Sequence, residues 1–216
     1  MNEPNLWPYL YPQRTANEPH LAVTRYGWLL KRFYRGVKAA DCLAIVLGGV
    51  TAPIGSNDKH STSPQRFARY LVRLGLMRYM DGYSHNPYAV GQSEPMPPPE
   101  VRPAFSAYTI SLGNIAALLR RVPKKPLYLT EYGYTTRPVT IIGGAHVSEA
   151  TQAAYMKRAF RYADRFPRIK LLMWVQRIDV SPSGSASDQA GSYFGLRRLD
   201  GTRKPSWYAF ARLRNR

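Results

Sequence analysis

The sequence contains a single cysteine, Cys42, so no disulfide can form within its 216 residues. This cysteine opens an apolar segment, and we interpret it as a small buried side chain. No apolar stretch reaches the ~18 residues that a membrane-spanning helix requires, so we expect no membrane as a partner. The first residues are polar and rich in proline, unlike a signal peptide, and the localisation stays unknown.

Acidic residues are also scarce, with 13 against 31 lysines and arginines, which gives a net charge of +18. Such a balance favours phosphate backbones or anionic surfaces as partners. The cations are nevertheless spread along the whole chain, and the three arginines at its end are the densest group. We therefore interpret them as a solvated surface and expect no nucleic acid as a partner. The alternative, a basic nucleic-acid-binding domain, would require the cations on one face with exposed aromatic side chains between them.

Glycine-rich phosphate loops are absent. Neither GxGxxG nor GxxxxGK[ST] follows any expected strand, which disfavours nucleotide binding. The content of hydrophobic residues, 44%, is typical of a folded domain, and we treat residues 1–216 as one unit. Tyrosine is frequent, with 16 residues, and its flat apolar ring with a polar tip suits both a sugar-binding site and an ordinary core.

Helical and strand-like patterns alternate along the chain. Apolar residues at helical spacing predict helices over 22–40, 64–79, 109–121, 148–166 and 205–213. Short apolar or aromatic runs predict strands over 42–50, 81–88, 126–131 and 169–176, most of them buried on both faces. A proline-rich loop is expected at 91–103 and a Gly/Ser-rich loop at 181–192. Strands separated by helices predict parallel βαβ units, as in a doubly wound sheet or a barrel.

Two glutamates occupy positions that suit a catalytic site. Glu3 lies in an Asn-Glu-Pro-Asn segment, and Glu131 is the last residue of the expected strand 126–131, within Thr-Glu-Tyr-Gly. In α/β barrels the carboxyl ends of the strands face the active site. A glutamate there is costly in a core and natural in a site, although an ion pair with an arginine would also explain it.

The two motifs together resemble those of clan A glycoside hydrolases, a superfamily with cellulase-like and β-xylosidase-like members. In this family Asn-Glu-Pro ends the fourth strand of a (β/α)8 TIM barrel and supplies the acid/base, whereas a glutamate ending the seventh strand is the nucleophile. Counting strands onward from Glu3 places Glu131 on the seventh. The resemblance therefore implies an α/β fold, the C-terminal half of the barrel, with strands five to eight and the end of strand four.

Other segments resemble the family in the same order. Residues 81–88 match the sixth-strand motif, in which a His and a Tyr border the nucleophile, and residues 200–210 match the closing run into the last helix. Trp174 ends the expected eighth strand, where the family often has an aromatic platform under the sugar; the alternative is a core residue. A further substrate contact is expected at position 133, in the Tyr-Gly-Tyr that follows Glu131.

The resemblance implies hydrolysis of β-linked glycosides by a retaining mechanism, without a cofactor or a metal. Glu131 would attack the anomeric carbon, and Glu3 would first protonate the leaving oxygen and then activate water. Asn2 would bind the neighbouring sugar hydroxyl.

Three side chains of the sixth-strand motif would support these groups. Tyr88 or Tyr83 would donate a hydrogen bond to Glu131, and His85 would orient the site unless it is a buried structural residue. We therefore include all three among the candidate substrate-binding residues.

The sequence begins at the acid/base motif, so we expect a truncated barrel with two open sheet edges. Its partners would be a carbohydrate substrate and either a missing N-terminal half or a second copy. Full-length members of the family are often secreted. A catalytically inactive fragment that keeps only carbohydrate binding is the main alternative to an enzyme, because it would share every motif.

Overall fold

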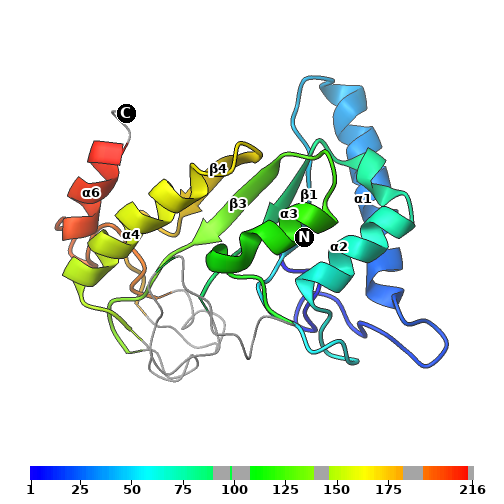
Figure 1. Ribbon diagram of the computed structural model, residues 1–216, viewed down its shortest axis with the longest axis horizontal. Helices are drawn as coiled ribbons and strands as arrows, with labels where there is room; N and C mark the ends of the chain where they lie inside the picture. The colour runs from blue at the N-terminus through cyan, green and yellow to red at the C-terminus, as the bar shows by residue number, and fades with distance from the viewer. Residues whose placement is uncertain (90–97, 99–107, 139–145, 182–191, 214–216) are drawn as a thin grey trace.

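A computed structural model describes residues 1–89, 98, 108–138, 146–181 and 192–213 (Figure 1). The expected proline-rich loop (91–103) lies outside the described residues except for residue 98, and so do residues 182–191 of the Gly/Ser-rich loop. The described chain forms a four-stranded sheet in the order β1-β2-β3-β4, and every neighbouring pair is parallel. The strands are β1 (Leu47–Thr51), β2 (Gly82–His85), β3 (Leu127–Tyr132) and β4 (Ile169–Trp174).

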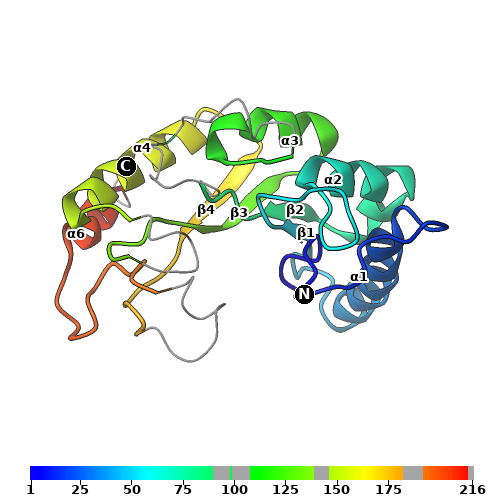
Figure 2. The same ribbon diagram turned by 90° about the horizontal axis from the view of Figure 1, so that it is seen from below.

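Helices follow the strands, as the alternating pattern predicts. The α-helices are α1 (Leu21–Ala40), α2 (Pro64–Arg73), α3 (Ile115–Arg121), α4 (Glu149–Ala163) and α6 (Pro205–Leu213), with short 3-10 helices η1 (Leu76–Tyr79) and η3 (Leu112–Asn114). Helices α2, α3 and α4 lie along one face of the sheet, and α1 flanks it beside β1 (Figure 2). This is the arrangement of consecutive βα units in a barrel, and it confirms the predicted α/β fold.

Local sequence signals set the ends of two helices. Pro64 provides the first turn of α2, where its missing N–H costs no hydrogen bond. The helix predicted over 64–79 is interrupted because Gly75 adopts a left-handed conformation (φ 67°), and η1 follows it. At α4, the Ser148 hydroxyl accepts a hydrogen bond from the Thr151 backbone N–H at 3.0 Å, which satisfies one of the free donors of the first turn.

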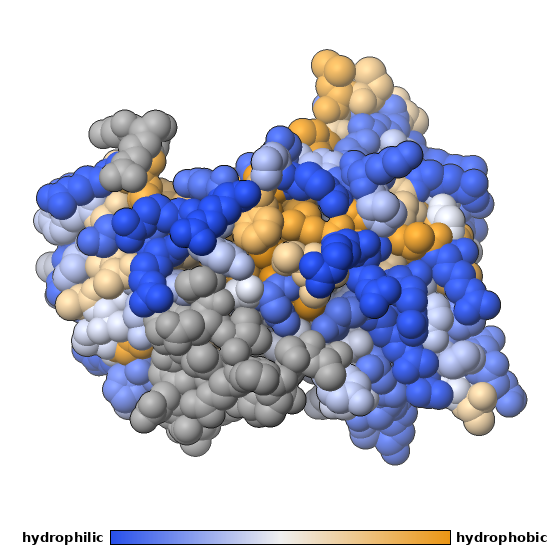
Figure 3. Space-filling model, viewed as in Figure 1, coloured by the Kyte–Doolittle hydropathy of each residue, from blue (hydrophilic) through white to orange (hydrophobic). Residues whose placement is uncertain are grey.

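The strand predicted over 42–50 begins only at Leu47, so its first half was predicted wrongly. Leu43 and Ile45 are 86% and 64% exposed, and Cys42 is exposed rather than buried. The Lys38 ammonium donates to the carbonyl oxygen of Ala44 at 2.6 Å and so holds this segment as a turn after α1. The apolar atoms at the top of the surface in Figure 3 lie over this turn.

Strand β4 differs from the expectation of a strand buried on both faces. Leu172 is 8% exposed, whereas Leu171 and Met173 are 38% and 48% exposed. Alternate residues of a strand point to opposite faces, so Leu171 and Met173 share the face opposite Leu172. Leu172 packs in the main core, and the opposite face is therefore the one away from the helices.

The same alternation sorts the side chains of β2 and β3. Tyr83, Leu127 and Leu129 are fully buried in the core beneath the helices. Ser84 and Thr130 lie on the other face, where their hydroxyl groups are 2.5 Å apart. This inner face, which would line the interior of a closed barrel, leads to the candidate catalytic residues.

None of the helices in the described ranges combines the length and the apolar character that crossing a membrane demands.

We predict that the chain self-associates in solution. Within the described residues, β1 and β4 each have one edge that pairs with no strand, and the inner face next to β4 exposes Leu171 and Met173. Sedimentation velocity should show dimers or larger species whose fraction falls in the Leu171→Lys/Met173→Lys variant. Val72→Lys is a matched control, because Val72 is also 38% exposed but belongs to helix α2 and not to a strand. A concentration-independent monomer would contradict this prediction.

Candidate active site

The backbone of Glu3 is hydrogen-bonded to the carboxyl end of β1. Its N–H donates to the carbonyl oxygen of Val50 at 2.9 Å. Both residues have positive φ angles, 41° for Glu3 and 47° for Val50. Residues other than glycine rarely adopt such angles, and they are especially unfavourable for a β-branched residue such as valine. Strain of this kind persists only where surrounding contacts hold it, and it is concentrated at functional sites.

Asn5 supplies those surrounding contacts. It is fully buried, and its Oδ1 accepts a hydrogen bond from the Ala52 N–H at 2.7 Å. Its Nδ2 donates to the carbonyl oxygens of Ile54 and Thr62, each at 3.0 Å. The second asparagine of the Asn-Glu-Pro-Asn motif thus fastens the segment to the loop between β1 and α2.

Glu131 lies near the end of β3, and Tyr88 contacts it. The Tyr88 hydroxyl donates to Oε2 of Glu131 at 3.2 Å. Of the two tyrosines expected as possible donors, the structure therefore brings Tyr88 to the carboxyl.

Asn86, which sequence reasoning did not assign to the site, lies beside both carboxyl groups. Its Nδ2 donates to Glu3 Oε1 at 3.2 Å and to Asn2 Oδ1 at 3.3 Å, and its amide is close enough to Glu131 to lower the pKa of that carboxyl. The Thr130 hydroxyl donates to Asn86 Oδ1 at 2.9 Å. That bond fixes the orientation of the amide, with the oxygen toward Thr130 and the N–H donors toward the two glutamates.

Burial raises the pKa of both glutamates, but different hydrogen bonds oppose this shift in each of them. Burial raises the pKa of Glu3 to about 7; the hydrogen bond from Asn86 opposes this shift, and the charge of Glu131 adds to it. Burial also raises the pKa of Glu131, but hydrogen bonds from Tyr88, Asn86 and Asn2 all act to lower it. Glu3 thus retains a proton near neutral pH, whereas Glu131 has more donors that stabilise its ionised form.

Tyr9 is a second residue that the sequence did not point to. Burial and the negative charges of Glu3 and Glu131 raise the pKa of its phenol, and a hydrogen bond with Asn2 acts in the opposite direction. The side chain is still 43% exposed, so a ligand can reach it beside both carboxyls. Tyr9 lies on the loop after the acid/base motif, and neither spacing nor periodicity marks it.

Two of the residues expected at the site lie in the core of the structure. Tyr83 and His85 are fully buried, on the helix side of β2. The His85 ring is held by the Thr51 hydroxyl and by the Ile110 carbonyl oxygen, each at 2.9 Å. Burial lowers the pKa of His85 to about 4, so the ring is neutral and structural at physiological pH.

Position 133 also differs from the expectation, because it is a glycine and has no side chain to offer a sugar. A Cβ on Gly133 would lie 2.8 Å from the Val175 carbonyl oxygen, so the backbones pass too closely for a larger residue. Trp174 is half-buried, its ring packs against Tyr132 with centroids 6.0 Å apart, and its indole N–H donates to the Phe194 carbonyl oxygen at 3.1 Å. These contacts give Trp174 a packing role.

A buried ion pair connects the loops that follow β3 and β4. Lys204 Nζ lies 2.8 Å from Asp179 Oδ1, and both side chains are almost fully buried. The ammonium also donates to the Thr136 hydroxyl at 2.9 Å, and the same Asp179 oxygen accepts from the Gly195 N–H at 2.7 Å. The closing segment 200–210 therefore holds the loops on the same edge of the sheet as Glu131.

The described residues include no group of three or more His, Cys, Asp or Glu side chains placed to hold a metal ion. The groups that meet at the site are two carboxyl groups, the amides of Asn2 and Asn86, and the phenols of Tyr9 and Tyr88.

No family model matches the chain, and no curated protein sequence is detectably similar to it. Solved structures do match. A family 39 glycoside hydrolase from Bacteroides cellulosilyticus WH2 has a TM-score of 0.61 and 20% identity, over 96% of this chain and 38% of its own. A monomeric β-xylosidase from Caulobacter crescentus CB15 has a TM-score of 0.59 and 22% identity, over 99% of this chain and 40% of its own.

The fold is similar to part of the TIM barrel of these structures. A β-glucuronidase from Bacteroides uniformis matches as well, with a TM-score of 0.56 and 21% identity, over 91% of this chain and 21% of its own. The chain thus spans well under half the length of each of these glycosidases, in agreement with a sheet that forms one part of a barrel.

We predict that Glu3→Gln stabilises the fold at pH 8 by up to about 3 kcal/mol and leaves it unchanged at pH 4. The pKa of Glu3 is about 7 in the folded chain against 4.5 ordinarily, so the wild type loses stability as the pH rises from about 4.5 to 7. Glutamine removes that loss. Urea unfolding at both pH values measures the effect. The exposed Glu18→Gln serves as control, and an equal gain at both pH values would contradict the burial argument.

We predict that Asn86→Ala makes Glu3 an acid about ten times weaker, with a pKa above 7, because the substitution removes a donor that favours the ionised form. The pKa of Glu131 should rise in the same variant. Carbon-13 NMR of labelled glutamate carboxyls would report both titrations. The exposed Asn17→Ala is the control. Unchanged titrations would show that the amide does not set the protonation of the pair.

Proposed function

We propose that this chain carries the catalytic pair of a retaining glycosidase that hydrolyses β-linked glycosides. One observation carries the proposal: two glutamates lie beside the same amide, Asn86, which donates to Glu3, while Tyr88 donates to Glu131, so that different contacts oppose the effect of burial on each carboxyl. A retaining glycosidase needs one carboxyl that holds a proton at rest and one that is ionised. The glycosidase fold and the two motifs at the strand ends support the same assignment.

In the first step, a Glu131 oxygen attacks the anomeric carbon and forms an ester bond while the bond to the leaving oxygen breaks. The proton of Glu3 passes to that oxygen. Tyr88, Asn86 and Asn2 stabilise the carboxylate of Glu131 before attack. As its negative charge is consumed, the repulsion that raises the pKa of Glu3 disappears, which suits the loss of the proton in the same step.

In the second step, the ionised Glu3 takes a proton from water, and the water oxygen attacks the anomeric carbon. The ester to Glu131 breaks, its carboxylate is restored, and Glu3 is protonated again. Two inversions at one carbon give overall retention. Asn86 stays hydrogen-bonded to Glu3 in both ionisation states, because an amide N–H can donate to either form.

We propose that Asn2 and Tyr9 bind the sugar. Both are partly exposed and lie beside the two carboxyls, and their phenol and amide groups match sugar hydroxyls. Trp7, 59% exposed on the same loop, offers a flat apolar face for a ring. A β-xyloside is the first substrate to test, because a β-xylosidase is among the structural matches.

The sheet described here covers one side of such a site, so we further propose that productive catalysis requires its open edges to be closed. The closing strands would come from a complementary half-barrel or from a second copy of the chain. Orientation of the sugar alone is worth several kcal/mol of the barrier, and an open site forgoes part of it.

We predict that a 2-deoxy-2-fluoro β-xyloside with a dinitrophenolate leaving group labels Glu131 covalently. Fluorine slows hydrolysis of the glycosyl-enzyme, so intact-mass spectrometry detects the label even when turnover is slow. Glu131→Gln should not be labelled. Glu3→Gln should still be labelled, because dinitrophenolate leaves without protonation. Azide should restore glycosyl transfer to Glu131→Ala by replacing the lost nucleophile.

Glu18→Gln is the matched control and should be labelled like the wild type. Glucosyl and glucuronyl reagents of the same design test the sugar. A label on another residue, or a folded chain that none of these reagents labels, would contradict the catalytic proposal and leave a non-catalytic domain.

A further inference from the structure

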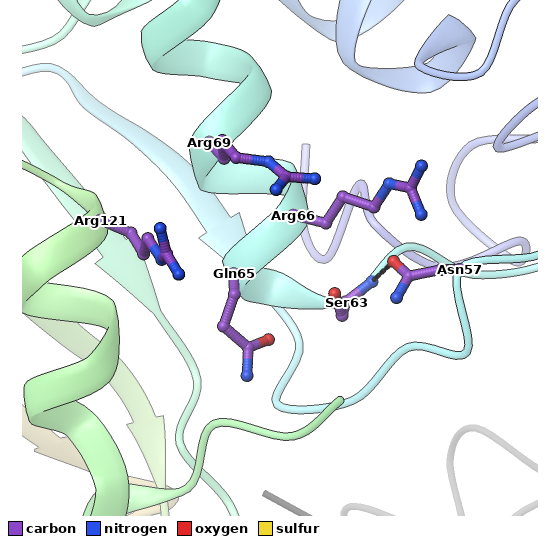
Figure 4. A pocket seen from close by; sticks show the side chains of 6 residues that line it. All are labelled: Asn57, Ser63, Gln65, Arg66, Arg69 and Arg121. Atoms are coloured by element: carbon purple, nitrogen blue, oxygen red, sulfur yellow. Dashed lines mark hydrogen bonds between the residues drawn. The ribbon is translucent and has the colours of Figure 1, made fainter. Parts of the chain in front are cut away.

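A polar pocket lies on the outer surface, between α2 and the neighbouring elements. It has a volume of about 190 Å³ and is lined by Asn57, Ser63, Gln65, Arg66, Arg69 and Arg121. Figure 4 shows Arg66 and Arg69 extending from α2 and Arg121 reaching from α3 toward α2. No acidic residue lines this pocket. Three arginines from two helices thus line one pocket that has no carboxylate among its lining residues.

The surrounding residues add positive potential. Arg14 lies nearby and donates to the Asn57 carbonyl oxygen at 3.1 Å. Burial acts to raise the pKa of the Tyr70 phenol, but a hydrogen bond from Arg66 and the charges of Arg66, Arg69 and Arg14 lower it overall. Because three arginines lower the pKa of this phenol, the electrostatic potential beside the pocket is positive.

The arginines have no counter-charge of their own. In the described part of the chain, the ion pairs involve Lys38, Arg198 and Lys204, and none involves an arginine of the pocket. The nearest polar contact of Arg66 is the uncharged Tyr70 hydroxyl, at 3.2 Å from Nη2. Like charges held together repel one another, and a bound anion would relieve that cost.

Neutral donors complete the lining. Asn57 Oδ1 accepts from the Ser63 N–H at 2.9 Å, which turns the amide nitrogen of Asn57 outward as a donor. The pocket also adjoins the first turn of α2, where the Ser63 side chain makes no capping hydrogen bond and no acidic residue offsets the positive end of the helix dipole. Planar guanidinium groups, amide donors and a helix N-terminus all favour one class of ligand.

We propose that this pocket binds a tetrahedral oxyanion, a phosphate or sulfate group, through Arg66, Arg69 and Arg121. It is a site separate from the glutamate pair: it is lined by other residues, and it lies on the helix side of the sheet, whereas the pair lies at the strand ends. The connection between the two is the loop from β1 to α2, in which Thr62 contacts Asn5 and the next residue, Ser63, lines the pocket.

Isothermal titration with sodium phosphate and sodium sulfate, at constant ionic strength set with chloride, tests the proposal. We expect saturable binding of at least one ion, and about tenfold or greater loss of affinity in Arg69→Gln and in Arg121→Gln. Arg73→Gln is the matched control, because Arg73 is an exposed arginine on the same helix outside the pocket. It should change the affinity by less than about threefold.

Absence of saturable binding, or an equal loss in Arg73→Gln, would overturn the proposal in favour of diffuse surface charge. The melting temperature without added anion verifies that each variant folds, and its rise at saturating phosphate gives a second readout. A glucose phosphate or galactose sulfate that binds more tightly than the free ion would identify a sugar ester as the ligand. Equal or weaker binding would identify the free ion. Neither readout involves turnover, so failure of the glycosidase proposal would not affect the result.

Discussion

The arrangement of the candidate site depends on one amide. Asn86 can serve two carboxyl groups because the Thr130 hydroxyl occupies its oxygen and leaves the nitrogen donors facing Glu3 and Glu131. Thr130 is itself held by Ser84, from the adjacent strand. The pairing of β2 with β3 therefore sets the orientation of a side chain at the strand ends, and that side chain lies between the carboxyl held beside β1 and the carboxyl on β3.

Stability elsewhere compensates for the cost of this site. Two desolvated carboxyls and two left-handed backbone conformations, at Glu3 and Val50, each oppose folding. The compensating contacts lie in the neighbouring loops, where Asn5 is fully hydrogen-bonded and Lys204 is paired with Asp179. These buried polar groups are satisfied almost entirely by backbone or charged partners, so they specify loop conformations that apolar packing would leave undetermined.

The alternation of helices and strands and the parallel sheet could be predicted from the sequence, because apolar periodicity reports burial. The choice of a barrel over a doubly wound sheet came from the resemblance of the motifs, since the alternation is the same in both. Within β2, the two-residue period of a strand, and not the motif resemblance, indicates which side chains are buried. Tyr83 is a large core residue, so His85 must share its face, and Ser84 and Asn86 must share the other. The start of β1 at Leu47 could not be predicted, since an exposed apolar turn has the same composition as a strand. Tyr9 reaches the site through loop geometry, which leaves no periodic signal.

The charge distribution explains why a strongly basic chain can keep a protonated glutamate. With a net charge of +18, a general positive potential would lower carboxyl pKa values, yet both values at the site are raised. In the described structure, the pKa values of Glu3 and Glu131 are set by burial and by neutral hydrogen-bond donors, and that of Glu3 also by the charge of Glu131. No lysine or arginine contributes to either shift. Cations beyond a Debye length of about 8 Å are screened by salt, whereas desolvation acts locally and in full. In the described part of the chain, the arginines on α2 and α3 line a pocket on the helix side, away from the two carboxyls, and this separation lets burial raise the pKa of Glu3 to about 7.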